Sequence, residues 1–162
     1  MPKAGSVRPA TIADVEALAL VHVHCWGETY SHILSAAALG RMTQEDMAEM
    51  WCRVVERAPA GTQFLAEAQG QIVGFSMCGR SREVDLPDAT ELYFIYLLKE
   101  HHGAGLGQDL LDALTPPQTL WVAADNPRAQ AFYRRNGFAA DGTTQTEHFF
   151  GEPIDEIRMV RA

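Results

Sequence analysis

The chain has 162 residues, 47% of them hydrophobic and 21% charged, values that indicate one globular domain. A chain of this length buries about 70% of the surface of its unfolded form, so we expect a stable core without disulfides or a structural metal. Its apolar runs are far shorter than the roughly 20 residues of a membrane span, which excludes a transmembrane helix. Because 21 acidic residues stand against 13 basic ones, the charge opposes binding to nucleic acid and favours a cationic small substrate.

The N-terminal segment and the cysteines predict a cytoplasmic location. Asp14 and Glu16 interrupt the apolar stretch where the core of an export signal would have to lie. Cys25, Cys52 and Cys78 are odd in number, widely spaced and without a C-x-x-C pair, which is typical of a reduced cytosolic chain.

The first half of the chain predicts a short strand around Val7 and two helices. Thr11 opens an N-terminal capping signature, after which apolar residues recur at helical spacing as far as Trp26. The same signature opens a second helix at Thr43, which continues until Pro59.

The second half predicts six strands and two helices. Two β-patterned runs flank the turn at Gln69-Gly70 and are close enough to form a hairpin. The next run is apolar on both faces, so we expect it in the centre of the sheet. In chain order the expected elements are strands at 64–68, 71–78 and 91–98, a helix at 108–114, a strand at 120–124, a helix at 126–137, and two strands from 138 to the end.

A glycine-rich turn, His102-Gly103-Ala104-Gly105-Leu106-Gly107, stands between the apolar strand and the helix that follows. Glycine allows positive φ and lets a ligand approach the bare backbone, while the unpaired N–H groups of a helix start favour anions. The turn therefore predicts a phosphate site, with a plain helix-start turn as the alternative. It fits neither the dinucleotide fingerprint, which needs glycine at 108 or 110, nor the P-loop, which needs a Gly-Lys pair.

Two segments, ELYFIYLLKEHHGAGLG and NPRAQAFYRRNGF, carry a family resemblance. They are similar to motif A (a strand, then Gln/Arg-x-x-Gly-x-Gly/Ala) and motif B (Asn-x-x-Ala-x-x-Phe-Tyr-x-x-x-Gly-Phe) of the GNAT superfamily of N-acetyltransferases. His102 departs from the usual Gln or Arg. Because the opening and the ending also resemble small bacterial members, the resemblance covers nearly the whole chain. It implies one α/β (α+β) domain over residues 1–162, whose central, mostly antiparallel mixed sheet is splayed at the cofactor site and carries helices on both faces.

The resemblance implies acetyl-CoA as the acetyl donor and assigns its binding residues. The pantetheine arm is expected along the strand and the pyrophosphate on the backbone amides of the turn. Asn126 is expected to bind the cofactor or to keep the two central strands apart at the same place. The alternative is that it only caps its helix. The implied contacts are Ile95, Tyr96, Leu97, His102, Gly103, Ala104, Gly105, Leu106, Gly107, Gln108, Asn126, Phe132 and Tyr133.

Three residues are implied to act in catalysis. The Leu97 N–H would polarise the thioester carbonyl, and Tyr133 would protonate the departing thiolate; the alternative for Tyr133 is a packing role. Glu91 matches the position where some members carry a glutamate base, since an alkylammonium with a pKa of about 10.4 must lose its proton. A strand-start carboxylate in solvent or in an ion pair is the alternative for Glu91.

The acceptor side is implied to be aromatic. Tyr93 shares the face of Glu91, and Trp26 and Tyr30 resemble an acceptor wall that holds a cation by cation–π attraction. Core packing is the alternative for Trp26. We expect no metal, because His22 and His24 point to different sides of their helix, and no activated cysteine for a covalent route.

The expected function is direct transfer of acetyl from acetyl-CoA to a primary amine of a small molecule or a peptide. The alternative is a CoA-binding or protein-interaction module with the same fold and little catalysis. The final segment, 149–162, offers a candidate sheet edge for a homodimer, with coverage within one chain as the equal alternative.

Overall fold

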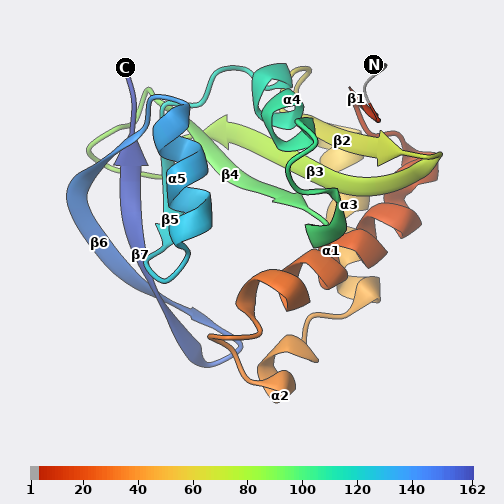
Figure 1. Ribbon diagram of the computed structural model, residues 1–162, viewed down its shortest axis with the longest axis horizontal. Helices are drawn as coiled ribbons and strands as arrows, with labels where there is room; N and C mark the ends of the chain where they lie inside the picture. The colour runs from red at the N-terminus through yellow and green to blue at the C-terminus, as the bar shows by residue number, and fades with distance from the viewer. Residues whose placement is uncertain (1–3) are drawn as a thin grey trace.

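The computed structural model describes residues 4–162 and confirms the predicted order of elements (Figure 1). The sequence did not predict α2, a single helical turn that is too short to show a helical repeat of apolar residues. The Ser35 side chain caps it by accepting a hydrogen bond from the Ala38 N–H. The elements are β1 (Ser6–Arg8), η1 (Ile12–Asp14), α1 (Val15–Tyr30), α2 (Ala36–Leu39), α3 (Gln44–Arg57), β2 (Gln63–Ala68), β3 (Gln71–Arg80), β4 (Thr90–Leu97), η2 (Lys99–His101), α4 (Leu106–Ala113), β5 (Thr119–Ala123), α5 (Pro127–Arg135), β6 (Ala139–Phe149) and β7 (Glu152–Val160).

One seven-stranded sheet, in the order β1-β2-β3-β4-β5-β7-β6, contains all the strands. Every neighbouring pair is antiparallel except β4 and β5, which are parallel and paired only at Glu91–Thr119 and Leu92–Leu120. Beyond Leu92 the two strands separate, and the halves of the sheet diverge in Figure 1. The mixed, splayed sheet with β4 at its centre is therefore confirmed.

Local signals begin the helices and the hairpin as predicted. Thr11 and Asp14 form a reciprocal capping box, and the Thr43 hydroxyl accepts a hydrogen bond from the Asp46 N–H. Gln69 and Gly70 both have positive φ, as a two-residue hairpin turn of matching twist requires.

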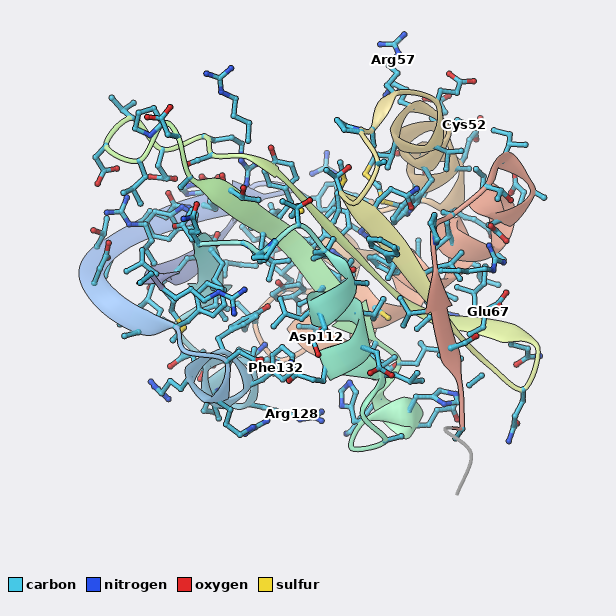
Figure 2. The ribbon with its side chains drawn as sticks, turned by 90° about the horizontal axis from the view of Figure 1, so that it is seen from above. Cys52, Arg57, Glu67, Asp112, Arg128 and Phe132 are labelled. Atoms are coloured by element: carbon cyan, nitrogen blue, oxygen red, sulfur yellow. The ribbon has the colours of Figure 1, made fainter. Side chains whose placement is uncertain are left out.

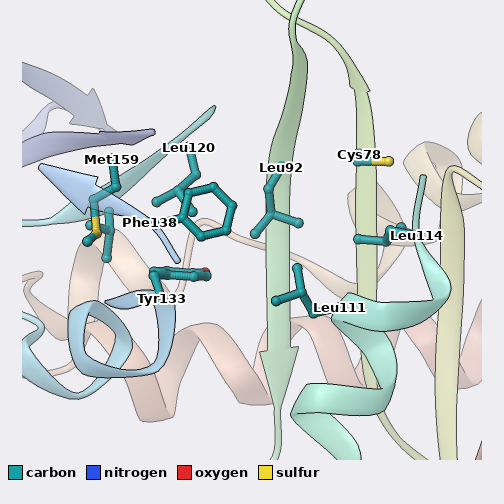
Figure 3. Packing of buried hydrophobic residues seen from close by; sticks show 9 residues of the cluster. Cys78, Leu92, Leu111, Leu114, Leu120, Tyr133, Phe138 and Met159 are labelled. Carbon is teal, nitrogen blue, oxygen red and sulfur yellow. The ribbon is translucent and has the colours of Figure 1, made fainter. Parts of the chain in front are cut away.

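Helices cover both faces of the sheet. On one face Leu18 of α1 and Trp51 of α3 pack against Phe75 of β3, and all three side chains are fully buried. On the other face a second core joins α4, α5 and the strands β4, β5 and β7 (Figure 3). This second core lies beside the point where β4 and β5 separate, so it supports both walls of the opening.

The C-terminal strand is not the sheet edge that the sequence suggested. β7 lies between β5 and β6, with Trp121 opposite Arg158 on one side and Thr144 opposite Ile157 on the other. The hairpin folds back so that its more apolar strand is enclosed and the polar β6 forms the edge. The homodimer stays a prediction, and its candidate edge moves to β6. No helix within residues 4–162 is long and apolar enough to cross a membrane.

His22 predicts a pH dependence of stability. It is buried, and its Nδ1 accepts a hydrogen bond of 3.1 Å from the Trp51 indole N–H, so folding favours the neutral ring. Burial lowers the pKa of His22 from 6.5 to about 4. The unfolded chain therefore binds the proton first as the pH falls, and we expect stability to be lost between pH 6.5 and pH 4.

The expected loss from His22 at pH 4.5 is about 2 to 3 kcal/mol relative to pH 8. The measurement is denaturant unfolding of the wild type and of His22→Gln, which keeps a hydrogen-bond acceptor for Trp51 but does not titrate. The difference between the two free energies of unfolding should change with pH in this window. Parallel pH profiles would show that the ring is not neutral in the fold.

Candidate active site

A cavity of about 580 Å³ opens where β4 and β5 separate. Its lining comes from both faces of the sheet, because the unpaired parts of β4 and β5 form its walls. Contributions from α1, β4, the glycine turn, β5 and α5 meet there: Glu28, Thr29, Tyr30, His32, Leu92, Tyr93, Phe94, Ile95, Tyr96, Leu97, Lys99, His102, Gly103, Gly105, Gly107, Gln108, Trp121, Val122, Ala123, Asn126, Arg128, Ala129, Phe132, Tyr133 and Arg135.

The backbone of β4 presents hydrogen-bonding groups to this cavity. Leu97 lies opposite Gly74, and the next N–H, that of Leu98, donates to the Val73 carbonyl. Because such bonds alternate along an antiparallel pair, the N–H of Leu97 points away from β3. It points to the side where β4 has no strand partner beyond Leu92. The same alternation directs Ile95 to that side.

The glycine turn has the predicted backbone geometry. Gly103 and Gly105 have φ of 84° and 88°, and Gly105 is the N-cap of α4. The amides that open α4, from Leu106 to Gln108, precede the first intrahelical donor, Asp109 N–H to the Gly105 carbonyl at 3.0 Å. A row of free N–H groups at the positive end of a helix dipole therefore faces the cavity, which suits a phosphate.

His102 ties the glycine turn to the end of β4. Its Nε2 donates to the Leu97 carbonyl at 2.7 Å, which places the ring proton on that nitrogen. The residue that departs from the family pattern is thus a brace between the strand and the turn.

Tyr133 of α5 and Asn126, the N-cap of that helix, both line the cavity. Tyr133 is 7% exposed and contacts the cavity, and its ring points from α5 toward β4 in Figure 3. Burial raises the pKa of this phenol, and none of the described residues hydrogen-bonds its hydroxyl. Asn126 also lines the cavity, but its Oδ1 accepts a bond from the Ala129 N–H at 3.1 Å, which confirms the capping role.

On the α1 side of the sheet the cavity wall is aromatic. The hydroxyls of Tyr30 and Tyr96 lie 2.9 Å apart, and burial raises the pKa of both phenols. Tyr93 also lines the cavity and donates to the Arg80 carbonyl at 2.6 Å. Trp26 does not line it: its ring packs on Tyr30 in the core, 8% exposed, which is the packing alternative.

Glu91 is buried as expected but is not part of the cavity lining. Its Oε1 accepts a 2.7 Å bond from Arg82 Nη2, and its Oε2 accepts from the Arg82 backbone N–H at 2.9 Å. Of the two roles that the sequence left open for Glu91, the ion pair is the one found. This carboxylate holds the β3–β4 loop and does not face an acceptor.

Sequence reasoning missed three cations around the cavity: Lys99, Arg128 and Arg135. The two arginines and Phe132 stand at i, i+7 and i+4 of α5, so they share one helix face. Figure 2 shows Arg128 and Phe132 on the side of α5 that faces Asp112 of α4. The spacing is visible in the sequence, but the acidic net charge of the whole chain masks this local basic patch.

The two buried cysteines are not activated as nucleophiles. Cys25 is 1% exposed, and burial raises its pKa to about 12. Burial also raises the pKa of Cys78, to about 11. Neither thiol forms the thiolate that a covalent transfer needs at neutral pH. Within residues 4–162, no three His, Cys, Asp or Glu side chains are grouped as a metal site would require.

The opened sheet and its glycine turn place the protein in the class of acyl-CoA-dependent acyltransferases. It belongs to the GNAT family: the family's acetyltransferase domain model matches residues 59–140. The 5-NmdU N-acetyltransferase of Pseudomonas phage PaMx11 is 32% identical over 120 residues, which cover 71% of this chain and 84% of that protein. The family is one of acetyl-CoA-dependent N-acetyltransferases.

Two further relatives match smaller shares of their own length. The uncharacterized N-acetyltransferase YuaI of Bacillus subtilis is 31% identical over 106 residues, 65% of this chain and 60% of YuaI. Mycothiol acetyltransferase of Streptomyces griseus is 38% identical over 112 residues, 61% of this chain and 33% of that protein. The PaiA N-acetyltransferase of Thermoplasma acidophilum, solved with coenzyme A, shares the fold with a TM-score of 0.73 at 21% identity, over 98% of this chain and 99% of that one.

Proposed function

We propose that the protein transfers the acetyl group of acetyl-CoA directly to a primary amine of a small molecule or a peptide. The observation that carries this proposal is that one cavity joins free helix-start amides, an unpaired strand edge and an unbonded tyrosine hydroxyl. These are the groups needed to hold a phosphate, an amide-containing arm and a leaving thiolate.

The donor would lie along the opened edge of β4 and across the glycine turn. The amides from Gly103 to Gln108 and the cations Lys99, Arg128 and Arg135 suit its phosphates, while the backbone at Ile95 and Leu97 suits its amide-bearing arm. The His102 amide, which the family resemblance included, already donates to the Lys99 carbonyl at 3.1 Å. Phe132, 3.9 Å from the position of a Cβ on Gly107, would close the cavity beside the turn.

The chemistry is the formation of a C–N bond and the breaking of the thioester C–S bond. The Leu97 N–H would stabilise the oxygen that gains negative charge, a contribution whose loss typically costs roughly 2.7 to 4 kcal/mol of barrier. The Tyr133 hydroxyl would give its proton to the departing thiolate. Its high pKa keeps the proton on the phenol until a thiolate appears next to it.

The acceptor is proposed as an amine that enters from the α1 side. Tyr30, Tyr93 and Trp121 line this part of the cavity, and aromatic faces attract ammonium groups. The names of the phage and Streptomyces relatives carry different compounds, 5-NmdU and mycothiol. The particular amine is therefore set by residues in which such relatives differ.

The experiment for this proposal is calorimetric titration with acetyl-CoA, with ATP as a control, followed by thiol release with polyamines, amino acids, amino sugars and peptides. We expect micromolar binding of acetyl-CoA, no heat with ATP, and turnover with at least one amine. Arg128→Ala should weaken acetyl-CoA binding more at low salt than at high salt, because its contribution is a screened charge. Binding without turnover of any amine would favour the CoA-binding module.

A further inference from the structure

Glu156 is a carboxylate on β7 that the assigned site does not use. It lies directly opposite Ala123 of β5 and Gln145 of β6. Ile154, two residues earlier, packs in a core with Ala123 and Trp26 of α1. Because side chains alternate along a strand, Glu156 points to the same α1 side as Ile154.

The strand register places this carboxylate one residue behind the cavity wall, because Glu156 is not itself among the lining residues but lies directly opposite one of them. Ala123 lines the cavity, and directly opposed residues of an antiparallel pair have their Cβ atoms about 5 Å apart. Glu156 is therefore one strand away from Ala123, and its side chain lies on the side of the sheet where Tyr30 and Tyr96 line the cavity. Its charge also acts on both phenols, raising their pKa values.

Glu156 has no cation of its own. The two arginines on this side, Arg82 and Arg158, bond other carboxylates: Arg82 bonds Glu91, and Arg158 bonds Glu83, Asp85 and Asp141. In the chain from residue 4 onward, no Lys, Arg or His forms an ion pair with Glu156. Its contacts include a side-chain hydrogen bond with Gln145, and Glu147 of β6 adds a second negative charge nearby.

We propose that Glu156 is the base of the reaction: through one bridging water it takes the proton of the acceptor's ammonium group. This inference rests on the proposed acetyl transfer. The acceptor R–NH3+ gives one proton to the Glu156 carboxylate, which becomes a neutral acid and later releases that proton to solvent. The freed electron pair of nitrogen forms the C–N bond, and the C–S bond breaks. A second proton leaves nitrogen to replace the one that Tyr133 gives to the thiolate.

The electrostatic surroundings suit this role. The pKa of Glu156 is raised from 4.5 to about 7, mainly by burial and also by the charges of Glu147 and Glu91, against the opposing effects of Arg82 and the Gln145 hydrogen bond. A base is most effective when its pKa is near the operating pH. The acid and the base also approach from opposite faces of the sheet, Tyr133 from α5 and Glu156 from the α1 side, with the opening between them.

The test is the pH profile of kcat/KM for Glu156→Gln and for a control, Glu147→Gln, with an amine that the wild type acetylates. The wild type should show a rising limb with a midpoint near pH 7, well below the titration of the amine. Glu156→Gln should lose that limb and about 100-fold or more of kcat. Glu147→Gln should keep turnover and move the limb to lower pH, because a like charge is removed from beside Glu156.

A readout without catalysis accompanies the profile. Ionisation of a half-buried carboxylate whose pKa the fold raises destabilises the folded state, so Glu156→Gln should raise the melting temperature at pH 8 more than at pH 4.5. Acetyl-CoA binding should stay within twofold of the wild type.

The outcomes separate the two proposals. If the wild type acetylates an amine and Glu156→Gln keeps both the limb and the rate, the base is elsewhere while the proposed function stands. A variant that loses rate but keeps the limb shows a merely structural role and also overturns the inference. If the wild type acetylates no amine, the proposed function itself fails, and the inference fails with it.

Discussion

Tyr133→Phe is expected to lower kcat about 1000-fold while the dissociation constant of acetyl-CoA stays within twofold. General acid catalysis typically contributes 100-fold to 10,000-fold, and here the departing thiolate has no other described hydroxyl donor on α5. The aromatic ring would remain in its core with Leu92 and Phe138, so folding should change little. The measurements are thiol release under saturating acetyl-CoA and calorimetry of the same preparation.

Tyr30→Phe is the matched control for this prediction. It also removes a buried hydroxyl from the cavity wall, but that hydroxyl is bonded to Tyr96 and lies on the acceptor side. We expect less than about a tenfold change in kcat, with the larger effect on the KM of the amine. A Tyr133→Phe variant as active as Tyr30→Phe would assign Tyr133 to packing alone.

Gly105→Val should weaken acetyl-CoA binding by about 100-fold. At φ of 88° a β-branched residue is strained by about 1 to 3 kcal/mol, and relief of that strain would turn the amides of the turn away from the phosphates. The loss of charge-assisted hydrogen bonds adds to the cost, and each 1.4 kcal/mol is a factor of about ten in affinity. Calorimetry with acetyl-CoA measures the effect directly.

Gly151→Val provides a control with the same backbone strain. Gly151 has φ of 84° in the turn between β6 and β7, and a Cβ there, as at Gly105, meets no atom within 4 Å. The two variants should lose similar amounts of stability, but only Gly105→Val should lose affinity. Equal affinities would contradict the phosphate site on the glycine turn.

The elements that the sequence predicted well are those set by local signals. Thr11 and Thr43 cap their helices, Gln69-Gly70 turns the hairpin, and Gly105 takes the positive φ that starts α4. In each case the conformation depends on residues within a few positions, so the pattern is visible in one stretch of chain. The position of β4 in the centre followed from its apolar residues on both faces.

What the sequence could not predict depends on contacts between distant segments. Glu91 is taken by Arg82 across the β3–β4 loop, and a bulge between Met77 and Cys78 shifts the register beside Tyr93. The insertion of β7 between β5 and β6 brings Glu156 opposite Ala123. Nothing near Glu156 in the chain marks it as a site residue, because its role follows from that strand order.

Two-substrate initial-rate kinetics distinguish direct transfer in a ternary complex from transfer through an acetylated enzyme. Acetyl-CoA and the amine are varied together, and the enzyme is weighed by mass spectrometry after incubation with acetyl-CoA alone. Because Cys25 and Cys78 are buried and no cysteine is among the residues that line the cavity, we predict intersecting reciprocal plots and an enzyme of unchanged mass. Parallel plots with an enzyme that gains one acetyl group would contradict the account.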